Sequence, residues 1–207
     1  HSAFFLGEYS YYGWWYYFPV LFLLKVSIFL LIFIAISVYT FYRVGLEKKD
    51  DQKLAEYMAI IFVFLFFAIS AFSDINIGIR HVLPVFPFIL FLCSKSIKYI
   101  KNKTPIYILA SLFALSSLFA APHYISFFNE AIGNDGYLYA LDSNYDWGQD
   151  LRGLSNYMKA NGIESIKLKY FGTAEPDYYG IEYEQLECSA ATGTIAISAQ
   201  HLQEVSS

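Results

Sequence analysis

Long apolar runs alternate with short polar segments over the first part of this chain. Four runs reach or approach the roughly 20 apolar residues that a spanning helix needs. They lie near residues 20–42, 54–72, 82–94 and 105–121. The first and last runs are apolar on every face, which favours helices in lipid over a buried bundle in a soluble protein. We therefore expect an α-helical, multi-spanning membrane region over residues 1–122, with about four transmembrane helices.

Lysine and arginine predict the side of the membrane on which each loop lies, because cytoplasmic loops carry an excess of both. Residues 43–53 and 95–103 hold four such residues each, whereas residues 74–81 hold only Arg80. We expect the two lysine-rich loops inside, and residues 74–81 and everything after about residue 122 outside. The aromatic cluster over residues 11–19 fits an outer interfacial belt.

From His123 onward, charged residues, Gly and Asn replace the apolar runs. Residues 148–160 have helical spacing of apolar residues and end at Asn161-Gly162. Asp146 is a candidate N-cap for this helix, with Gln149 completing a capping box. Alternation over residues 165–171 and 192–199 predicts strands, and residues 136–143 are a third candidate. We expect a small extracytoplasmic α/β domain over residues 123–207, truncated at its end, with some parallel pairing.

The composition removes several function classes. The 207 residues are 57% hydrophobic, too apolar for an ordinary soluble protein. The net charge of −4 lacks the basic footprint of a nucleic-acid partner. Cys93 and Cys188 have no metal-like or redox spacing. The chain begins without Met or a signal peptide, and we suspect a piece of a longer protein.

Three basic side chains are candidates for holding a phosphate. Arg80 and His81 directly precede the third run, whose Pro84 and Pro87 can leave backbone groups free to line a cavity. An ionisable group at this depth suggests a site, and arginine offers a fork of donors; the alternative is that Arg80 contacts lipid headgroups. Lys25 is a second candidate, although we expect its ammonium to snorkel outward.

The polar stretch DSNYDWGQDL, residues 142–151, can be tested as a calcium loop. Asp142, Asn144 and Asp146 match the opening of an EF-hand loop, but Trp147 replaces the required Gly and Gly153 the bidentate Glu. No nucleophile-elbow or phosphate-loop motif occurs in the sequence. We predict no metal ligands here, although a divalent metal elsewhere stays open.

Sugar binding is the other function that this stretch suggests. Hydroxyl groups could bond to Asp142, Asn144 and Gln149 while a sugar ring packs on Trp147. Glu130 could join such a site, although docking of the outer domain is the simpler role for it and for His123. Equally simply, Asp146 caps a helix, Trp147 packs beneath it and Asp142 ends a strand.

Six stretches together resemble the C-terminal half of membrane-embedded, lipid-carrier-dependent glycosyltransferases related to the protein O-mannosyltransferases. These stretches are residues 6–25, 76–88, 122–130, 142–151, 169–181 and 197–203. The resemblance implies a type C glycosyltransferase fold and transfer of a sugar from a polyprenyl-phosphate carrier to a glycan, lipid or protein acceptor on the outer membrane face. It also implies a bacterial or archaeal plasma membrane.

In that family an acidic residue of the first outer loop is the catalytic base, and this chain has no such loop. We therefore leave the catalytic residue unassigned and place Arg80 first, with Lys25 and His81, as holders of the carrier phosphate. After ISAQHLQ relatives continue with Gly, whereas here Glu204 follows. Two other functions remain open: a transporter subunit, which would predict paired repeats, and a membrane-anchored, non-catalytic module that binds glycan or protein.

Overall fold

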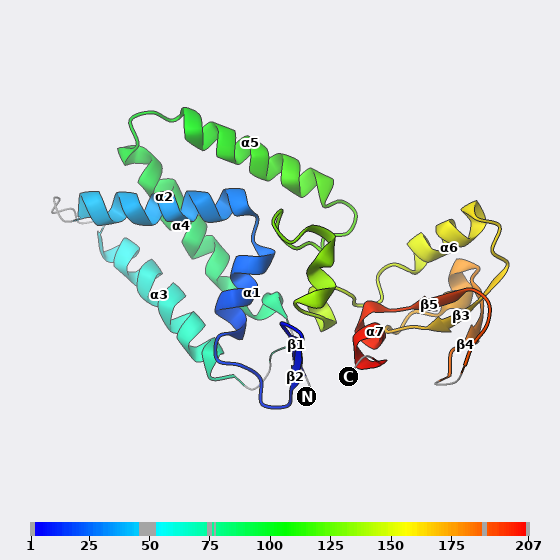
Figure 1. The fold of residues 1–207 in the computed structure, drawn as a ribbon. Coiled ribbons are helices and arrows are strands. Elements are labelled where there is room, and N and C mark those ends of the chain that lie inside the picture. The colour runs from blue at the N-terminus through cyan, green and yellow to red at the C-terminus, as the bar shows by residue number, and fades with distance from the viewer. Residues whose placement is uncertain (1–2, 46–52, 74–75, 77, 188–189, 206–207) are drawn as a thin grey trace.

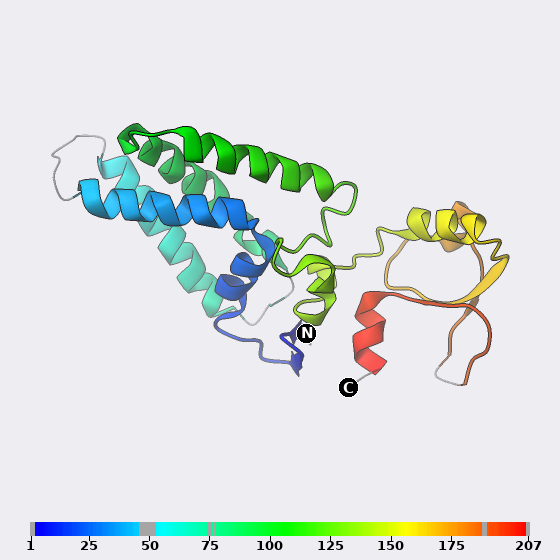
Figure 2. The same ribbon diagram turned by 45° about the horizontal axis from the view of Figure 1, so that its top comes forward.

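The computed structural model describes residues 3–45, 53–73, 76, 78–187 and 190–205. Most of the chain is helical, with a small sheet region. In Figures 1 and 2 the helices α1 to α5 lie together, and α6 lies with strands β3 to β5 at the other end of the molecule. The segment between α5 and α6 joins these two parts. Its position decides where the candidate residues meet.

The helical part contains fewer clear spans than the sequence predicts. Among the described residues, two helical runs are long and apolar enough to cross a membrane: α3 (Lys53–Ala71) and the run Ile79–Tyr99. That run consists of the 3-10 helix η1 (Ile79–Val85), α4 (Phe86–Ser96) and the short η2 (Ile97–Tyr99). It is longer than the expected 82–94, because a 3-10 helix accommodates Pro84. Helix α5 (Thr104–Phe119) is a shorter apolar helix of 16 residues.

The first predicted span, residues 20–42, is not one straight helix. It is divided between α1 (Tyr17–Lys25) and α2 (Ile28–Gly45), and the two axes are bent by 115°. Counting this pair as one span gives up to three spans, against the four expected. The exposed apolar side chains along α3 would be unfavourable in water, which is consistent with membrane insertion. Lys48, Lys49 and Asp74, used above to predict sidedness, lie outside the described residues.

Charges at the helix ends stabilise the break between α1 and α2. Glu130 accepts hydrogen bonds from the amide of Ile28 at 2.8 Å and the hydroxyl of Ser27 at 2.7 Å, at the positive end of α2. The Ser116 hydroxyl of α5 donates to the same carboxylate. Lys25 is the last residue of α1, where the helix dipole favours a cation. A carboxylate and an ammonium thus lie at the two helix ends that face the bend.

An N-terminal hairpin, which the sequence did not predict, covers the start of α1. Strands β1 (Ala3–Phe5) and β2 (Glu8–Ser10) pair antiparallel around a turn in which Leu6 and Gly7 both have positive φ. Phe5 is buried with Tyr17 and Phe18 of α1. The aromatic cluster of residues 11–19 therefore contributes to a protein core as well as to the surface.

The sheet part confirms the predicted parallel pairing. Strands β3 (Ser165–Lys169), β4 (Glu182–Gln185) and β5 (Ile195–Ile197) form a parallel sheet in the order β4-β3-β5. Helix α6 (Leu151–Ala160) buries Leu151 and Met158 against the sheet, and it ends at Asn161 as predicted. The third strand candidate, residues 136–143, is wrong. It overlaps the 3-10 helices η3 (Gly133–Leu138) and η4 (Asp142–Asn144), with one isolated bridge from Ala140 to Phe5.

The cap of α2 makes stability depend on pH. Burial alone would raise the pKa of Glu130, but hydrogen bonds from Ser116, the Ile28 amide and Ser27 lower this pKa below its ordinary value. Because the pKa of Glu130 is lower in the folded state, ionised Glu130 stabilises the protein at every pH above its unfolded-state pKa of about 4.3. This stabilisation is lost as the pH falls through the folded-state pKa.

We expect Glu130→Gln to destabilise the protein near neutral pH by about 0.5–1 kcal/mol, the lower part of the range for a helix-end charge, because the side chain is exposed. Thermal unfolding in detergent from neutral to acidic pH checks this. The gap between wild type and variant should close as pH falls below about 4.3. Glu164→Gln, at an exposed glutamate before β3, is the control. A gap that is constant with pH contradicts the assigned role.

Candidate functional site

Residues 142–151 lie where the helical part and the sheet part meet. Asn144 is fully buried in this junction. Its amide nitrogen donates to the Tyr17 hydroxyl at 2.9 Å and to the Leu141 carbonyl at 3.0 Å, and its amide oxygen accepts from the Ile79 amide at 2.9 Å. The side chain therefore ties α1 and η1 to this segment. It is not accessible to a sugar, contrary to the sequence-based prediction.

Lys25 points into the protein at the same junction. Its ammonium donates to the carbonyl oxygens of Ile125 at 2.8 Å and Asn144 at 2.5 Å, and lies 4.6 Å from the centroid of the Phe128 ring. The expectation that Lys25 snorkels outward is therefore wrong. An ammonium has three donors, and two are used here. Lys25 is thus mainly a structural group and a weak candidate for a phosphate.

Asp142 and Asp146 bond residues 142–151 to Ala199 and Gln200. Asp146 does not cap α6, because α6 begins at Leu151, after Asp150, without a side-chain cap. Instead, the Asp146 carboxylate accepts from the amides of Gly148 and Ala199, each at 2.9 Å. The Asp142 amide donates to Gln200 at 2.8 Å. Helix α7 (Ala199–Val205) is fixed against the segment in this way.

Arg80 and Trp147, predicted separately, lie together. The guanidinium carbon of Arg80 is 5.3 Å from the centroid of the Trp147 ring. Arg80 is exposed and Trp147 is 47% exposed, so a ligand can reach both. Further rings extend this pair. Trp147 packs edge to face on Phe171, with ring centroids 5.7 Å apart, and Phe171 packs in the same way on His201, with ring centroids 5.9 Å apart. This pair combines a cation with an accessible aromatic plane.

The other predicted residues have mixed roles. His81 is exposed and packs edge to face on Phe18, with ring centroids 6.2 Å apart. Gln149 accepts from the Trp147 amide at 2.7 Å and donates to the Tyr145 carbonyl at 3.1 Å, which fixes the turn that presents Trp147. Glu130 belongs to the cap of α2. Among the described residues, no three His, Cys, Asp or Glu side chains gather as metal ligands would.

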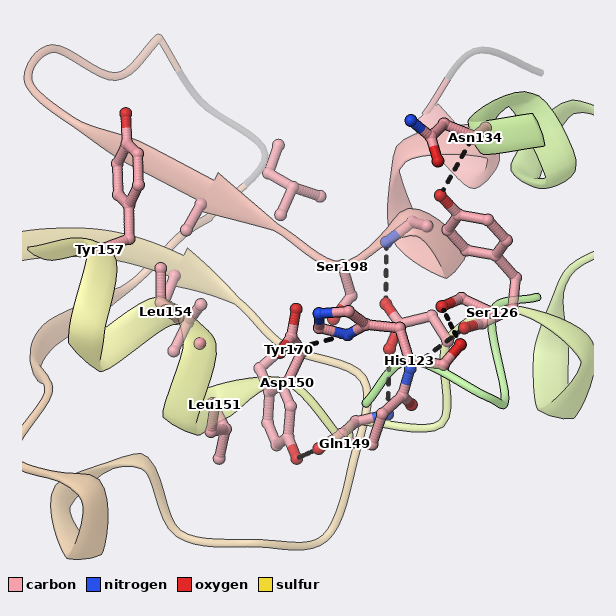
Figure 3. A pocket seen from close by; sticks show the side chains of 18 residues that line it. His123, Ser126, Asn134, Gln149, Asp150, Leu151, Leu154, Tyr157, Tyr170 and Ser198 are labelled. Atoms are coloured by element: carbon pink, nitrogen blue, oxygen red, sulfur yellow. Dashed lines mark hydrogen bonds and ion pairs between the residues drawn. The ribbon is translucent and has the colours of Figure 1, made fainter. Parts of the chain in front are cut away.

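A cavity of about 700 Å³ opens on the side of the segment that carries Gly148 and Asp150. Figure 3 shows His123 and Asp150 facing each other in it, between α6 and the loop after α5. The His123 Nδ1 and Asp150 Oδ1 atoms are 3.9 Å apart. Further lining residues are Ser126, Asn134, Tyr157, Tyr170 and Ser198. Sequence reasoning missed this cavity, because its residues come from distant segments without a shared motif.

Tyr170 gives this cavity a neutral hydroxyl group. Its hydroxyl donates to the Gly148 carbonyl at 2.6 Å. Burial, followed by the negative charge of Asp146, raises the pKa of Tyr170. The hydroxyl therefore stays protonated at physiological pH, and the turn at Gly148 stays fixed against β3.

Loss of the Asn144 amide should destabilise the junction. In Asn144→Leu, similar in size, the Ile79 amide and the buried Tyr17 hydroxyl lose the Asn144 side chain as their partner. Each buried polar group left unpaired costs about 1–3 kcal/mol, so we expect a loss of about 2–6 kcal/mol in the free energy of unfolding, measured by denaturant in detergent. Asn156→Leu, at an exposed position on α6, should change stability by less than about 0.5 kcal/mol. Equal losses of stability in the two variants would contradict the stabilising role of Asn144 in the junction.

The junction thus presents two surfaces of different chemistry. One is the cation and aromatic plane of Arg80 and Trp147. The other is the cavity with hydroxyl, imidazole and carboxylate groups. Comparisons with protein-family models, curated proteins and solved structures find no match.

Proposed function

We propose that this chain is part of an integral membrane glycosyltransferase that moves a sugar from a polyprenyl-phosphate carrier to an acceptor on the outer face of a bacterial or archaeal plasma membrane. The observation that carries this proposal is the pairing of Arg80 with Trp147. A guanidinium presents a planar fork of donors that matches a phosphate. The apolar indole plane beside it suits the C–H face of a sugar ring.

The position of Arg80 fits a substrate whose tail stays in the bilayer. Arg80 is the second residue of the Ile79–Tyr99 run, which is apolar and long enough to span a membrane. Trp147 comes from the segment that Asn144 holds against the start of this run. A carrier phosphate at Arg80 would thus sit at the end of a spanning helix, with its sugar toward Trp147 and its prenyl chain in lipid.

In the proposed reaction, an acceptor hydroxyl oxygen attacks the anomeric carbon of the sugar and the bond from that carbon to the phosphate oxygen breaks. The polyprenyl phosphate leaves with the electron pair, and the hydroxyl proton passes to a carboxylate. By the family resemblance, that carboxylate belongs to an earlier part of the protein. Arg80 would stabilise the negative charge that grows on the leaving phosphate. Trp147 would orient the sugar.

A membrane-anchored binding module is the second candidate, and the cavity of about 700 Å³ favours it. A cavity of this size could hold a glycan without any reaction. The two functions differ in one measurable respect. A glycosyltransferase transfers label from a polyprenyl-phosphate sugar to an acceptor, whereas a binding module retains the sugar unchanged.

We expect Arg80→Ala in the full-length protein to weaken binding of a polyprenyl-phosphate sugar about 10- to 100-fold, the effect of losing a charge-assisted hydrogen bond of about 1.5–3 kcal/mol. Arg80→Lys keeps the charge but loses the fork of donors, so its affinity for the donor should lie between those of the wild type and Arg80→Ala. The matched control is Arg152→Ala, at an exposed arginine on α6. Binding by radiolabelled donor in nanodiscs checks the series, and unchanged affinity in Arg80→Ala contradicts the assignment.

Trp147 separates recognition of the sugar from recognition of the phosphate. Trp147→Ala should weaken binding of the sugar-bearing carrier more than binding of the bare polyprenyl phosphate, because only the sugar packs on the ring. Trp147→Phe, which keeps an aromatic plane, should retain most of the affinity. The same loss for both ligands would mean that Trp147 acts only by supporting Arg80.

A further inference from the structure

An apolar groove opens beside the polar cavity. The groove has a volume of about 500 Å³ and lies between α2 and α5. Its apolar lining consists mainly of Phe29, Leu112, Leu115, Phe119, Phe127 and Phe128. His123, Ser126 and Asn134 line both the groove and the cavity. The two spaces therefore adjoin along these three residues and offer a continuous surface that changes from apolar to polar.

The walls of the groove belong to the helical part of the protein. Phe29 lies in the first turn of α2, and Leu112, Leu115 and Phe119 lie on α5. Both helices are apolar along their length, and α1 with α2 forms a candidate broken span. Ser116 and Glu130 also line the groove, and they bond to each other. The remaining apolar side chains can contact a hydrocarbon chain.

The charges of the cavity exclude a phosphate as the preferred head group. Its lining contains the carboxylates of Asp146 and Asp150 and the imidazole of His123, and it contains neither lysine nor arginine. The Asp146 carboxylate is bonded to two backbone amides, whereas the Asp150 side chain is 60% exposed beside His123. Hydroxyl or ammonium groups complement such a surface, and a second anion would be repelled.

We propose that the groove and the cavity together form the acceptor site, and that the acceptor is an amphipathic lipid with a neutral or amino-sugar head group. The hydrocarbon chain lies between α2 and α5, and the head group lies near Asp150, Ser198 and Tyr157. This inference rests on the proposed glycosyltransferase function and names its acceptor class. Arg80 and Trp147 line neither space, so both remain available for binding the donor.

The test uses the full-length protein in nanodiscs and an alkyl glucoside with a photoreactive diazirine in its alkyl chain. We expect crosslinks in residues 112–130, suppressed by excess unlabelled alkyl glucoside. An alkyl phosphate of equal chain length and free glucose should each compete at least tenfold less well. Equal competition by the alkyl phosphate would overturn the head-group assignment. Equal competition by free glucose, or better competition by a serine- and threonine-containing peptide, would overturn the lipid acceptor.

Two substitutions locate the site. Leu115→Trp fills the groove, and Ser126→Trp blocks the place where the groove meets the cavity; each should lower crosslinking about tenfold. Leu118→Trp is the matched control, because Leu118 is 68% exposed on the same helix and does not line the groove. Unfolding midpoints must show that the variants fold. Undiminished crosslinking in both folded variants would overturn the proposal.

A third substitution distinguishes failure of this inference from failure of the proposed function. Arg80→Ala should weaken donor binding and leave alkyl glucoside crosslinking unchanged. If donor binding depends on Arg80 but crosslinking does not map to the groove, the acceptor assignment is wrong and the glycosyltransferase function stands. If crosslinking maps to the groove but donor binding is independent of Arg80, the donor assignment is wrong, and the groove is a lipid-binding site without an acceptor role.

Discussion

The amide of Asn144 joins three parts of the molecule that are far apart in sequence. It bonds to Tyr17 of α1, to the Ile79 amide at the start of η1 and to its own segment at Leu141. Its backbone carbonyl also accepts the Lys25 ammonium. Polar groups buried without partners are costly, so these bonds hold the segment in one position. Because Trp147 follows three residues later and Arg80 follows Ile79, the same bonds bring the indole and the guanidinium together.

A second polar contact shapes the helical part. Glu130 occupies the positive end of α2, and Lys25 the negative end of α1, so the apolar run bends where a straight helix would otherwise continue. The bend brings the start of α2 beside the end of α5, where the Ser116 hydroxyl reaches Glu130. The apolar groove forms between these two helices and meets the cavity at His123. Two polar contacts thus place an apolar space and a polar space side by side.

Local patterns predicted some of the elements, whereas the hairpin of β1 and β2, strand β4 and helix α7 were not predicted. Apolar spacing and Asn161-Gly162 were enough to place α6, and alternation located β3 and β5. The break after Lys25 depends on the Glu130 carboxylate, which accepts a hydrogen bond from the Ile28 amide, 102 residues earlier in the chain. No local pattern reveals this contact. Asp146 has the residue type and spacing of a cap, but the Ala199 amide takes its carboxylate instead. Arg80 and Trp147 were each found by chemistry; only the fold shows that they are neighbours.

The most direct test of this account is a disulfide between residues 78 and 143. A Cβ atom on Gly78 would lie 3.6 Å from the Cβ atom of Ser143, close to the mean of about 3.8 Å in disulfides. With other cysteines replaced, Gly78→Cys/Ser143→Cys should oxidise readily to a linked peptide pair in mass spectrometry, with donor binding retained. Gly78→Cys/Asn156→Cys should not link. Absence of the 78–143 disulfide under oxidation would contradict the docking of residues 142–151 on η1, and with it the pairing of Arg80 and Trp147.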